Sequence, residues 1–258
     1  TGCKIILTVH GYLTYEAETR HWCSVGDNSH QWLWAMEVKG YDRYDAVICV
    51  AERTIKHVGQ FTAKPIALIS NGLDTDFFHP VVGSRDSLYS KQVVLFAGVL
   101  EEAKGIMDAL EAIRVLVVDH HLQNILLLIA GTGTQSAQAL QYAHEQGIAE
   151  NVKFLGLVER EKMADFYRSG DVLWFPSKPA GVSGMSAESS PYSVLEALAS
   201  GVPVVAYRTG GLHEQIQDGV NGYLVEPGDY SRLACRTRQL LNDEHLRRQM
   251  GSAAREEC

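Results

Sequence analysis

The stretch Val93-Val-Leu-Phe-Ala-Gly98 decides the fold, because it is a short apolar run that ends in a glycine. Apolar residues at every position, rather than at alternate ones, are typical of a strand that is buried on both faces of a parallel sheet. Residues 106–118 follow with apolar side chains recurring at every third and fourth position, which predicts a helix. A second apolar run, Ile125 to Ala130, comes next. Together these segments predict a strand–helix–strand unit with parallel strands.

The same alternation continues toward the C-terminus. It predicts helices at 135–146, 161–168, 192–199 and 212–217, and strands at 152–155, 171–175 and 203–206. Regular alternation of short buried strands with helices predicts an α/β fold with a doubly wound parallel sheet.

The first 80 residues are less regular. Residues 5–9, 46–50 and 66–69 predict strands, whereas residues 22–44 are rich in Trp and His without clean periodicity. Residues 80–90 are polar and predict a linker. Because two or three strands make a poor independent core, we expect residues 1–82 to be a Rossmann-like domain that lacks a sizeable N-terminal piece. Residues 83–258 are expected to form a second Rossmann-like domain.

The composition excludes several classes of protein. A net charge of −8 argues against nucleic-acid binding, which needs clustered Lys and Arg, and gives no broad basic surface for anionic lipids. The apolar runs are too short to span a bilayer. An odd number of scattered cysteines without a C-x-x-C pair predicts free thiols in a reducing compartment. These cysteines are Cys3, Cys23, Cys49, Cys235 and Cys258.

The strongest candidate site is Glu188-Ser-Ser-Pro-Tyr-Ser-Val-Leu-Glu196, which follows the predicted strand at 171–175. Ser190 is a good N-cap, and Pro191 suits the first helical position. The free amides of that helix start would bind an anion such as a pyrophosphate. Glu196 lies among apolar neighbours, so its carboxylate needs donors, which the two hydroxyls of a ribose would supply. The alternative is a pair of surface glutamates beside a capped helix, and the apolar setting of Glu196 favours the ribose.

Other polar or glycine-rich positions also follow predicted strands. Lys104 lies at the start of the helix at 106–118, where a bound phosphate would explain its charge; an exposed loop lysine is an equal alternative. Gly131 and Gly133 would allow close approach of a ligand, although such glycines more often mark a tight turn. Residues 210–214 predict a turn and a helix start. His10 ends the first strand, and a lone histidine there is more often structural than catalytic.

These residues resemble the family 4 glycosyltransferases, which are retaining enzymes with the GT-B fold of two Rossmann-like domains. The most specific match is Pro176-Ser177, the two glutamates eight positions apart, and the Ala-Leu-Ala-Ser-Gly-Val-Pro-Val-Val that ends at Val205. Supporting matches are residues 69–80, 152–156 and 210–225.

The resemblance implies a role for each matched residue. Glu196 would hold the donor ribose, Lys104 would neutralise the phosphates, and Glu188 and His10 would face the transferred sugar. With Lys104, His10 and Glu188 would be the catalytic residues. The remaining donor-binding residues would be Gly98, Gly131, Gly133, Ser189, Ser190, Pro191 and Tyr192, with the base near Gly156 and Leu157.

The chain departs from the family pattern at two places. The family usually has an arginine where this chain has Val99, and loss of one charge-assisted contact costs about 1.5–3 kcal/mol. The glycine-rich first turn of the N-terminal domain also has no counterpart here. The C-terminal helix that crosses back between the domains is expected to be cut short at Cys258.

The sequence therefore predicts a hexosyltransferase type of enzyme that moves a sugar from a nucleoside diphosphate sugar to an acceptor hydroxyl, with retention. The acceptor would be a glycan, a polysaccharide or a lipid-linked molecule. No cofactor or metal is expected, since no residue cluster has metal-ligand spacing. We expect a cytoplasmic protein, with peripheral contact to the inner face of the membrane as an option. The alternatives are a nucleotide-sugar-binding module without activity, and an epimerase or phosphorylase of the same fold, for which the sequence shows no convincing residues.

Overall fold

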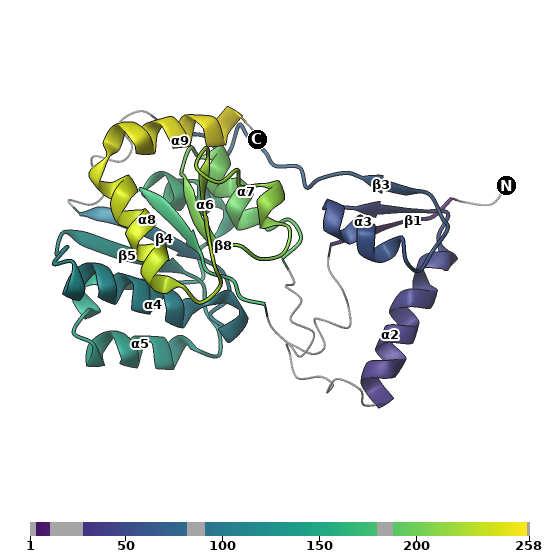
Figure 1. Cartoon of the computed structure of the whole chain (residues 1–258), viewed down its shortest axis with the longest axis horizontal. Helices are drawn as coiled ribbons and strands as arrows, with labels where there is room; N and C mark the ends of the chain where they lie inside the picture. The colour runs from purple at the N-terminus through teal and green to yellow at the C-terminus, as the bar shows by residue number, and fades with distance from the viewer. Residues whose placement is uncertain (1–3, 11–27, 82–90, 180–187, 257–258) are drawn as a thin grey trace. The chain divides into compact units, whose positions relative to one another are not determined.

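The computed structural model describes residues 4–10, 28–81, 91–179 and 188–256 (Figure 1). The chain divides into two compact units. The first unit consists of residues 1–72, 179–191 and 209–215, and the second of residues 73–178, 192–208 and 216–258. The predicted linker at 80–90 lies almost wholly outside the described residues.

The second unit is built on a six-stranded parallel sheet with the order β6-β5-β4-β7-β8-β9. Its strands are β4 (Gln92–Ala97), β5 (Ile125–Ala130), β6 (Val152–Gly156), β7 (Val172–Phe175), β8 (Val204–Tyr207) and β9 (Gly222–Val225). The chain adds strands outward from β4 on one side and then returns to add β7 to β9 on the other. This is the order of doubly wound nucleotide-binding domains. The predicted α/β class and parallel sheet are confirmed.

Helices cover both faces of this sheet (Figure 1). One layer contains α4, α5 and α8, and the other contains α6 and α7, with α9 in contact with both α7 and α8. These helices are α4 (Ile106–Arg114), α5 (Ser136–Glu145), α6 (Arg160–Arg168), α7 (Tyr192–Ala199), α8 (Tyr230–Asn242) and α9 (Glu244–Glu256). The predicted helix at 106–118 is α4 continued by a π-helical turn, Val115–Asp119.

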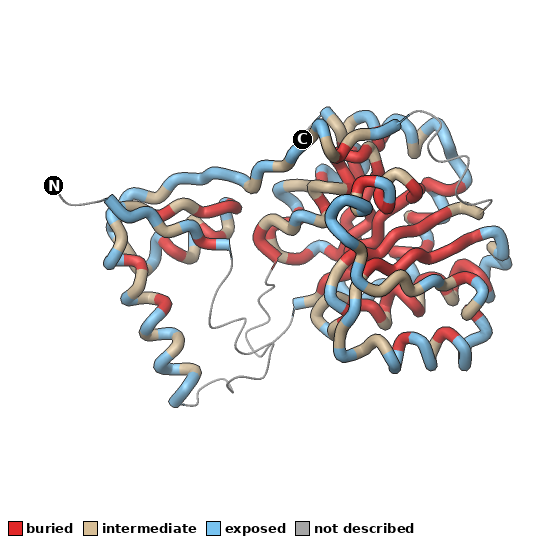
Figure 2. The backbone as a smooth tube through the Cα atoms, turned by 180° about the vertical axis from the view of Figure 1, so that it is seen from behind, coloured by how far each residue is buried: buried red, intermediate tan, exposed pale blue. Residues whose placement is uncertain are grey.

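The core of the second unit lies between the sheet and the layer of α4, α5 and α8. Alternate residues of the strands enter it, for example Phe96 from β4, Ile129 from β5 and Trp174 from β7. Every residue of β5, β7, β8 and β9 is buried, which explains their uninterrupted apolar sequences (Figure 2). The indole of Trp174 donates a hydrogen bond of 2.6 Å to Thr237, so its one polar atom is satisfied inside the core.

The first unit contains a three-stranded parallel sheet with the order β1-β2-β3. Its elements are β1 (Ile6–Val9), α2 (Asn28–Gly40), a 3-10 turn (Tyr41–Arg43), β2 (Ala46–Cys49), α3 (Glu52–Val58) and β3 (Ile66–Leu68). The three predicted strands are confirmed. Their core is small and consists of Val9, Tyr41, Val47, Cys49 and Val58.

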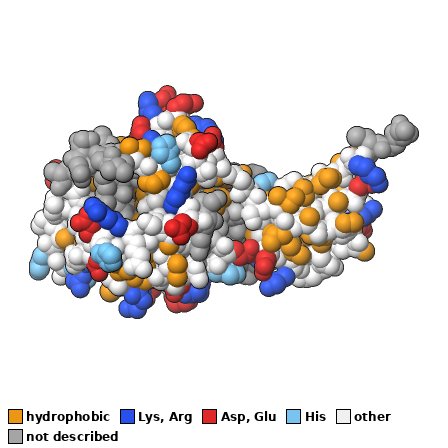
Figure 3. Space-filling model, turned by 90° about the horizontal axis from the view of Figure 1, so that it is seen from above, with side chains coloured by type: hydrophobic (Ala, Val, Ile, Leu, Met, Phe, Trp, Pro, Cys, Tyr) orange, Lys and Arg blue, Asp and Glu red, His pale blue; other side chains and the backbone are white. Residues whose placement is uncertain are grey.

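Apolar side chains remain at the surface of this unit. They include Ile6 of β1, Leu68 of β3, and Trp32 and Met36 of α2, and hydrophobic side chains gather on the unit in Figure 3. In α2 the usual pattern is inverted, because the carboxylate-bearing Glu37 is the buried residue while Trp32 is 61% exposed. This inversion is the reason that α2 was not predicted from periodicity.

One predicted helix is wrong. Instead of a helix at 212–217, the chain forms only a 3-10 turn, Leu212–Glu214. The amide of Gln217 donates to the side chain of Asn221 at 2.9 Å rather than to a helical carbonyl. Gly219 follows in a left-handed conformation, with φ of 84°. The segment therefore closes a turn before β9.

Candidate active site

The carboxyl edge of the larger sheet is where a ligand of a doubly wound domain binds, at the point where the strand order reverses. That point lies between β4 and β7, which pair in parallel register. Gly98, Gly131 and Gly156 end the neighbouring strands β4, β5 and β6. The amide of Gly98 donates to Ala130 at 3.0 Å, and the amide of Gly131 donates to Gly156 at 2.7 Å. The structure thus brings these three predicted residues side by side.

Gly131 and Gly133 are required by the chain itself. A Cβ atom at Gly131 would overlap the carbonyl oxygen of Gly98, and one at Gly133 would overlap the backbone of Leu100. The amide of Leu100 also donates to Thr132 at 3.0 Å. These backbone contacts explain why glycines are needed in a tight turn here. A contact between the glycines and a ligand stays a prediction.

Lys104 ends a 3-10 turn, Glu102–Lys104, and α4 begins two residues later. Gly105 between them has a left-handed φ of 71°, and a Cβ atom there would overlap the carbonyl of Pro176. The segment after β7 is tied to the same turn, because Ser177 Oγ and the Lys178 amide donate to Ala103 at 3.0 and 2.8 Å. The turn that carries Lys104 is thus tied to the segment after β7, and contact of Lys104 with a phosphate stays a prediction.

Val99 stands in the same loop, immediately after Gly98. Its side chain is 47% exposed, so the position of the family's arginine is open to solvent in this chain.

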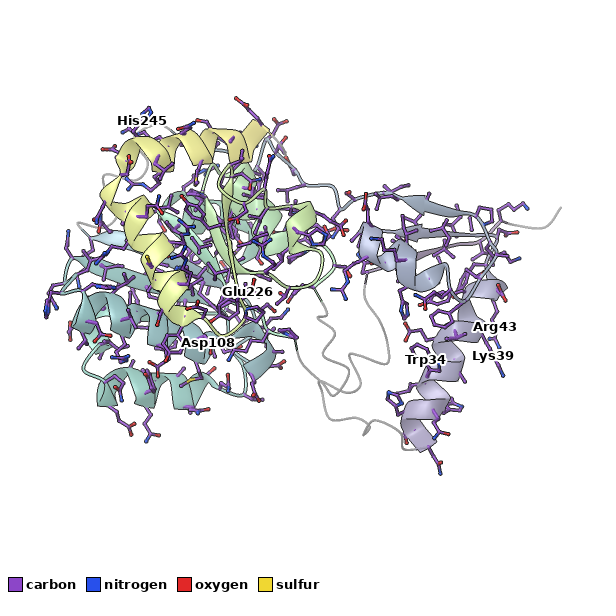
Figure 4. All side chains as sticks on the ribbon, viewed as in Figure 1. Trp34, Lys39, Arg43, Asp108, Glu226 and His245 are labelled. Atoms are coloured by element: carbon purple, nitrogen blue, oxygen red, sulfur yellow. The ribbon has the colours of Figure 1, made fainter. Side chains whose placement is uncertain are left out.

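A buried cluster near the start of α4 was missed by sequence reasoning. Asp108, which is labelled in Figure 4, is 8% exposed. It accepts a hydrogen bond of 2.7 Å from the Tyr207 hydroxyl and pairs with the Lys178 ammonium at 2.5 Å. Burial and the contact with Asp108 raise the pKa of Tyr207, which therefore stays protonated. The sequence signal was a lone acidic residue on an otherwise apolar helix face. We interpret the cluster as structural, because every charge in it has its partner inside the protein.

Glu196 lies on α7, which follows β7 in the chain. Its carboxylate is only half-buried, rather than fully enclosed as the apolar neighbours predicted. The reason is that the buried face of the helix consists of Val194, Ala197, Leu198 and Ala199. Burial raises the pKa of Glu196, while a hydrogen bond from Tyr167 and the charge of Arg160 lower it. The Tyr167 hydroxyl donates to Oε2 at 2.8 Å.

The start of α7 differs by one residue from the prediction. The helix begins at Tyr192, so Pro191 precedes the first helical residue instead of occupying it. Ser190 uses its hydroxyl to accept a hydrogen bond of 2.9 Å from Gln215, and its carbonyl accepts one of 2.8 Å from Asn71. These contacts hold the loop in front of the helix.

Glu188 and Ser189 belong to the first unit, and both are buried. The carbonyl of Glu188 accepts hydrogen bonds from the Gly211 amide at 2.8 Å and from the Arg53 side chain at 3.4 Å. A Cβ atom at Gly210 or Gly211 would overlap the carbonyls of Glu188 or Ser189, so the two glycines allow this close approach. The predicted turn at 210–214 therefore packs directly on the loop that carries Glu188.

Glu214 in that turn binds the N-terminus of α3. Its carboxylate accepts hydrogen bonds from the amides of Glu52 at 2.7 Å and Arg53 at 3.3 Å. These are the first amides of α3, which have no partner inside the helix. Glu214 thus caps a helix about 160 residues earlier in the chain, which no local pattern could reveal.

His10 directly follows β1, and its side chain is exposed. It belongs to the first unit, as do Glu188, Ser189, Ser190 and Pro191, whereas Lys104, Tyr192 and Glu196 belong to the second. Leu157, the predicted neighbour of the base, is 81% exposed after β6. The predicted roles of all these residues toward a ligand stay predictions.

The strand order defines a doubly wound α/β fold, in which ligands bind beyond the carboxyl ends of the strands. The family described as Glycosyl transferases group 1 matches residues 85–257, and the family described as Glycosyltransferase Family 4 matches residues 1–77. The chain therefore belongs to the family 4 glycosyltransferases, as its sequence motifs predicted, and to an enzyme family of the glycosyltransferase type.

Two curated relatives illustrate the family. A D-inositol 3-phosphate glycosyltransferase of Corynebacterium jeikeium is 34% identical over 206 residues, which cover 75% of this chain and 47% of that protein. A GDP-mannose-dependent alpha-(1-6)-phosphatidylinositol monomannoside mannosyltransferase of Mycobacterium tuberculosis is 30% identical over 203 residues, covering 75% of this chain and 51% of that protein. The chain thus spans about half the length of the curated relatives that it matches.

Solved structures confirm the GT-B fold. Sucrose-phosphate synthase from Thermosynechococcus elongatus superposes with a TM-score of 0.79 and 23% identity, covering 98% of this chain and 62% of that one. Anabaena HepE in complex with UDP superposes with a TM-score of 0.77 and 21% identity, covering 98% of this chain and 66% of that one.

In the described part of the chain, none of the helices combines the length and the apolar character that a membrane span requires.

Proposed function

We propose that this chain carries the donor-binding part of a retaining glycosyltransferase that moves a sugar from a nucleoside diphosphate sugar to an acceptor hydroxyl. Residues 83–258 would bind the donor, and residues 1–82 would form part of the acceptor side. The observation that carries the proposal is Glu196, a half-buried carboxylate on the helix that follows the switch-point strand β7. Its position in the family signature and its need for hydrogen-bond donors both suit the hydroxyls of a ribose.

The other predicted residues take complementary roles in this proposal. Lys104, on the turn that is tied to the segment after β7, would neutralise the departing diphosphate together with the first amides of α7. Glu188 and His10 would face the transferred sugar. One relative is named for D-inositol 3-phosphate and the other for phosphatidylinositol monomannoside, and only the second name states a donor, GDP-mannose. The base of the donor therefore has to be found by experiment.

Calorimetry tests the donor assignment. UDP, GDP and ADP are titrated separately into the chain without added metal. We expect one of them to bind more tightly than the other two, which names the base. Absence of binding by all of them would reject the donor site. Retention is tested separately, by determining the anomeric configuration of the first product by NMR. An inverted product would reject the retaining mechanism.

A second candidate function is a nucleotide-sugar-binding module without turnover. The exposed Val99 favours it, because the family usually supplies an arginine at this position. Val99→Arg would add a cation next to Gly98 and should tighten nucleoside diphosphate binding roughly tenfold. Release of nucleoside diphosphate from the matching sugar nucleotide is then measured for both proteins. Turnover by the unaltered chain rejects the inactive module, whereas turnover only by Val99→Arg supports it.

A further inference from the structure

Tyr167 near the end of α6 is completely buried, yet its hydroxyl reaches the half-buried carboxylate of Glu196 on the neighbouring helix α7. We propose that Tyr167 is a positioning residue for Glu196: it occupies Oε2 and thereby directs Oε1 toward a ribose hydroxyl of the nucleotide. This inference rests on the proposed function of Glu196. No sequence motif gave Tyr167 a role. In this proposal Oε2 of Glu196 binds the protein and Oε1 binds the ligand.

The geometry of the carboxylate supports this division. The Tyr167 hydroxyl lies 2.8 Å from Oε2, which is the usual length of an O–H···O hydrogen bond. Among the residues that the structure describes, none donates a hydrogen bond to Oε1. The terminal torsion of a glutamate is broad, so without a donor the two oxygens would exchange places freely. One fixed donor is sufficient to set the plane of the carboxylate before the ligand arrives.

The ring of Tyr167 is itself held in place. It makes edge-to-face contacts with Phe166 and Phe78, at centroid distances of 5.3 and 6.0 Å. Phe78 is fully buried, and its carbonyl accepts a hydrogen bond of 2.9 Å from Arg255 of α9. The hydroxyl therefore has a fixed position, and a fixed donor lowers the entropy lost when the ligand binds.

In the described part of the chain, two side chains of α6 act on the Glu196 carboxylate. From α6, Arg160 acts on it through space and Tyr167 by direct contact. From α9, Arg255 donates to the carbonyl of Ala199 at the end of α7. Burial raises the pKa of Glu196, and the Tyr167 hydrogen bond opposes that rise. Tyr167 thus favours the ionised carboxylate, which can accept hydrogen bonds from the ribose hydroxyls without donating one.

The same unit contains a matched control. Tyr207 is also completely buried, and its hydroxyl also donates to a carboxylate, that of Asp108, at 2.7 Å. Tyr167→Phe and Tyr207→Phe therefore each remove one buried hydroxyl and keep the ring. A general effect of losing such a hydroxyl should appear in both variants, whereas an effect through Glu196 should appear only in the first.

The first test removes the Tyr167 hydroxyl from the protein and the ribose hydroxyls from the ligand, separately and together, and compares the losses in binding. Binding is measured for the preferred nucleoside diphosphate among UDP, GDP and ADP, and for its 2′,3′-dideoxy analogue. We expect Tyr167→Phe to weaken ribonucleotide binding roughly tenfold and to change binding of the dideoxy analogue little. Tyr207→Phe should bind both ligands like the unaltered chain. Equal weakening of both ligands by Tyr167→Phe would overturn the proposal.

The second test does not need a ligand. The side-chain carboxyl of Glu196 is followed by NMR with 13C-labelled glutamate, and its signal is assigned by its loss in Glu196→Gln. We expect Tyr167→Phe to move the titration midpoint of this signal to higher pH, and Tyr207→Phe to leave it in place. An unchanged midpoint in Tyr167→Phe would contradict the positioning contact.

The two tests separate the failure of this inference from the failure of the proposed function. If the unaltered chain binds the ribonucleotide and the dideoxy analogue equally, or binds neither, Glu196 does not hold a ribose and the donor assignment fails. If the chain discriminates between the two ligands and Tyr167→Phe discriminates equally well, the donor assignment holds and the role of Tyr167 is rejected.

Discussion

Asp108 and Glu196 both have carboxylates that are partly or largely removed from solvent, and their surroundings stabilise the two groups differently. Each places a carboxylate in the second unit against the hydroxyl of a completely buried tyrosine. Asp108 is nearly enclosed and also has the ammonium of Lys178, so its charge is balanced within the protein. Glu196 is half-buried, and its direct donor is the neutral Tyr167. We therefore expect the first carboxylate to stabilise the fold, and we propose that the second accepts hydrogen bonds from a ligand.

The largest effect should follow from breaking the enclosed region. Asp108→Ala leaves the Lys178 ammonium and the Tyr207 hydroxyl without their acceptor, and we expect the free energy of unfolding to fall by about 3 kcal/mol. Urea denaturation measures this directly. Glu196→Gln serves as the comparison, because glutamine still offers an oxygen to Tyr167 and should cost far less. A loss below about 1 kcal/mol in Asp108→Ala would remove the distinction between the regions.

Lys104 and Lys178 should also differ in their roles. Lys178 is engaged by Asp108, whereas Lys104 is predicted to face the phosphates. We expect Lys104→Met to weaken nucleoside diphosphate binding roughly tenfold and to leave nucleoside binding unchanged. Lys178→Met should lower stability without this selective loss. The comparison is made by calorimetry at low ionic strength, and the same loss in both variants would argue against separate roles.

The smallest effect concerns the pH dependence of stability. Because burial raises the pKa of Glu196, the folded chain holds this proton more tightly than the unfolded chain. The resulting stabilisation is complete below the unfolded pKa of about 4.3 and is lost as the pH rises through the folded value. The unaltered chain should therefore lose unfolding free energy relative to Glu196→Gln as the pH rises from 4 to 7. A difference that grows in the opposite direction would show that the folded state favours the ionised form.

Much of the larger domain could be predicted from the sequence. Strands such as Ile125–Ala130 are buried on both faces, so the information that defines them is local and continuous. The positions of Lys104 and Glu196 relative to strand ends followed from the same alternation. The sequence also predicted a tight turn at Gly131. It did not show why glycine is required there, which is that a Cβ atom would overlap the carbonyl oxygen of Gly98.

The remaining features depend on residues far apart in the sequence. Tyr167 and Glu196 are separated by 29 positions, and Tyr207 and Asp108 by 99. The helix predicted at 212–217 did not form, and its Glu214 instead caps α3. Helix α2 escaped prediction because its tryptophan Trp32 is exposed and its Glu37 is buried. Periodicity reports on which face of an element is buried, and it carries no information on such pairings.

We propose above that Glu196 holds the ribose of a nucleoside diphosphate donor. Calorimetry of the preferred nucleotide with Glu196→Gln tests it most directly. Glu244→Gln is the control, because Glu244 is an exposed glutamate of α9 that pairs with Arg248. We predict that Glu196→Gln weakens binding at least roughly tenfold and that Glu244→Gln leaves it unchanged. Undiminished binding by Glu196→Gln, in a protein that remains folded, would show that Glu196 does not hold the ribose.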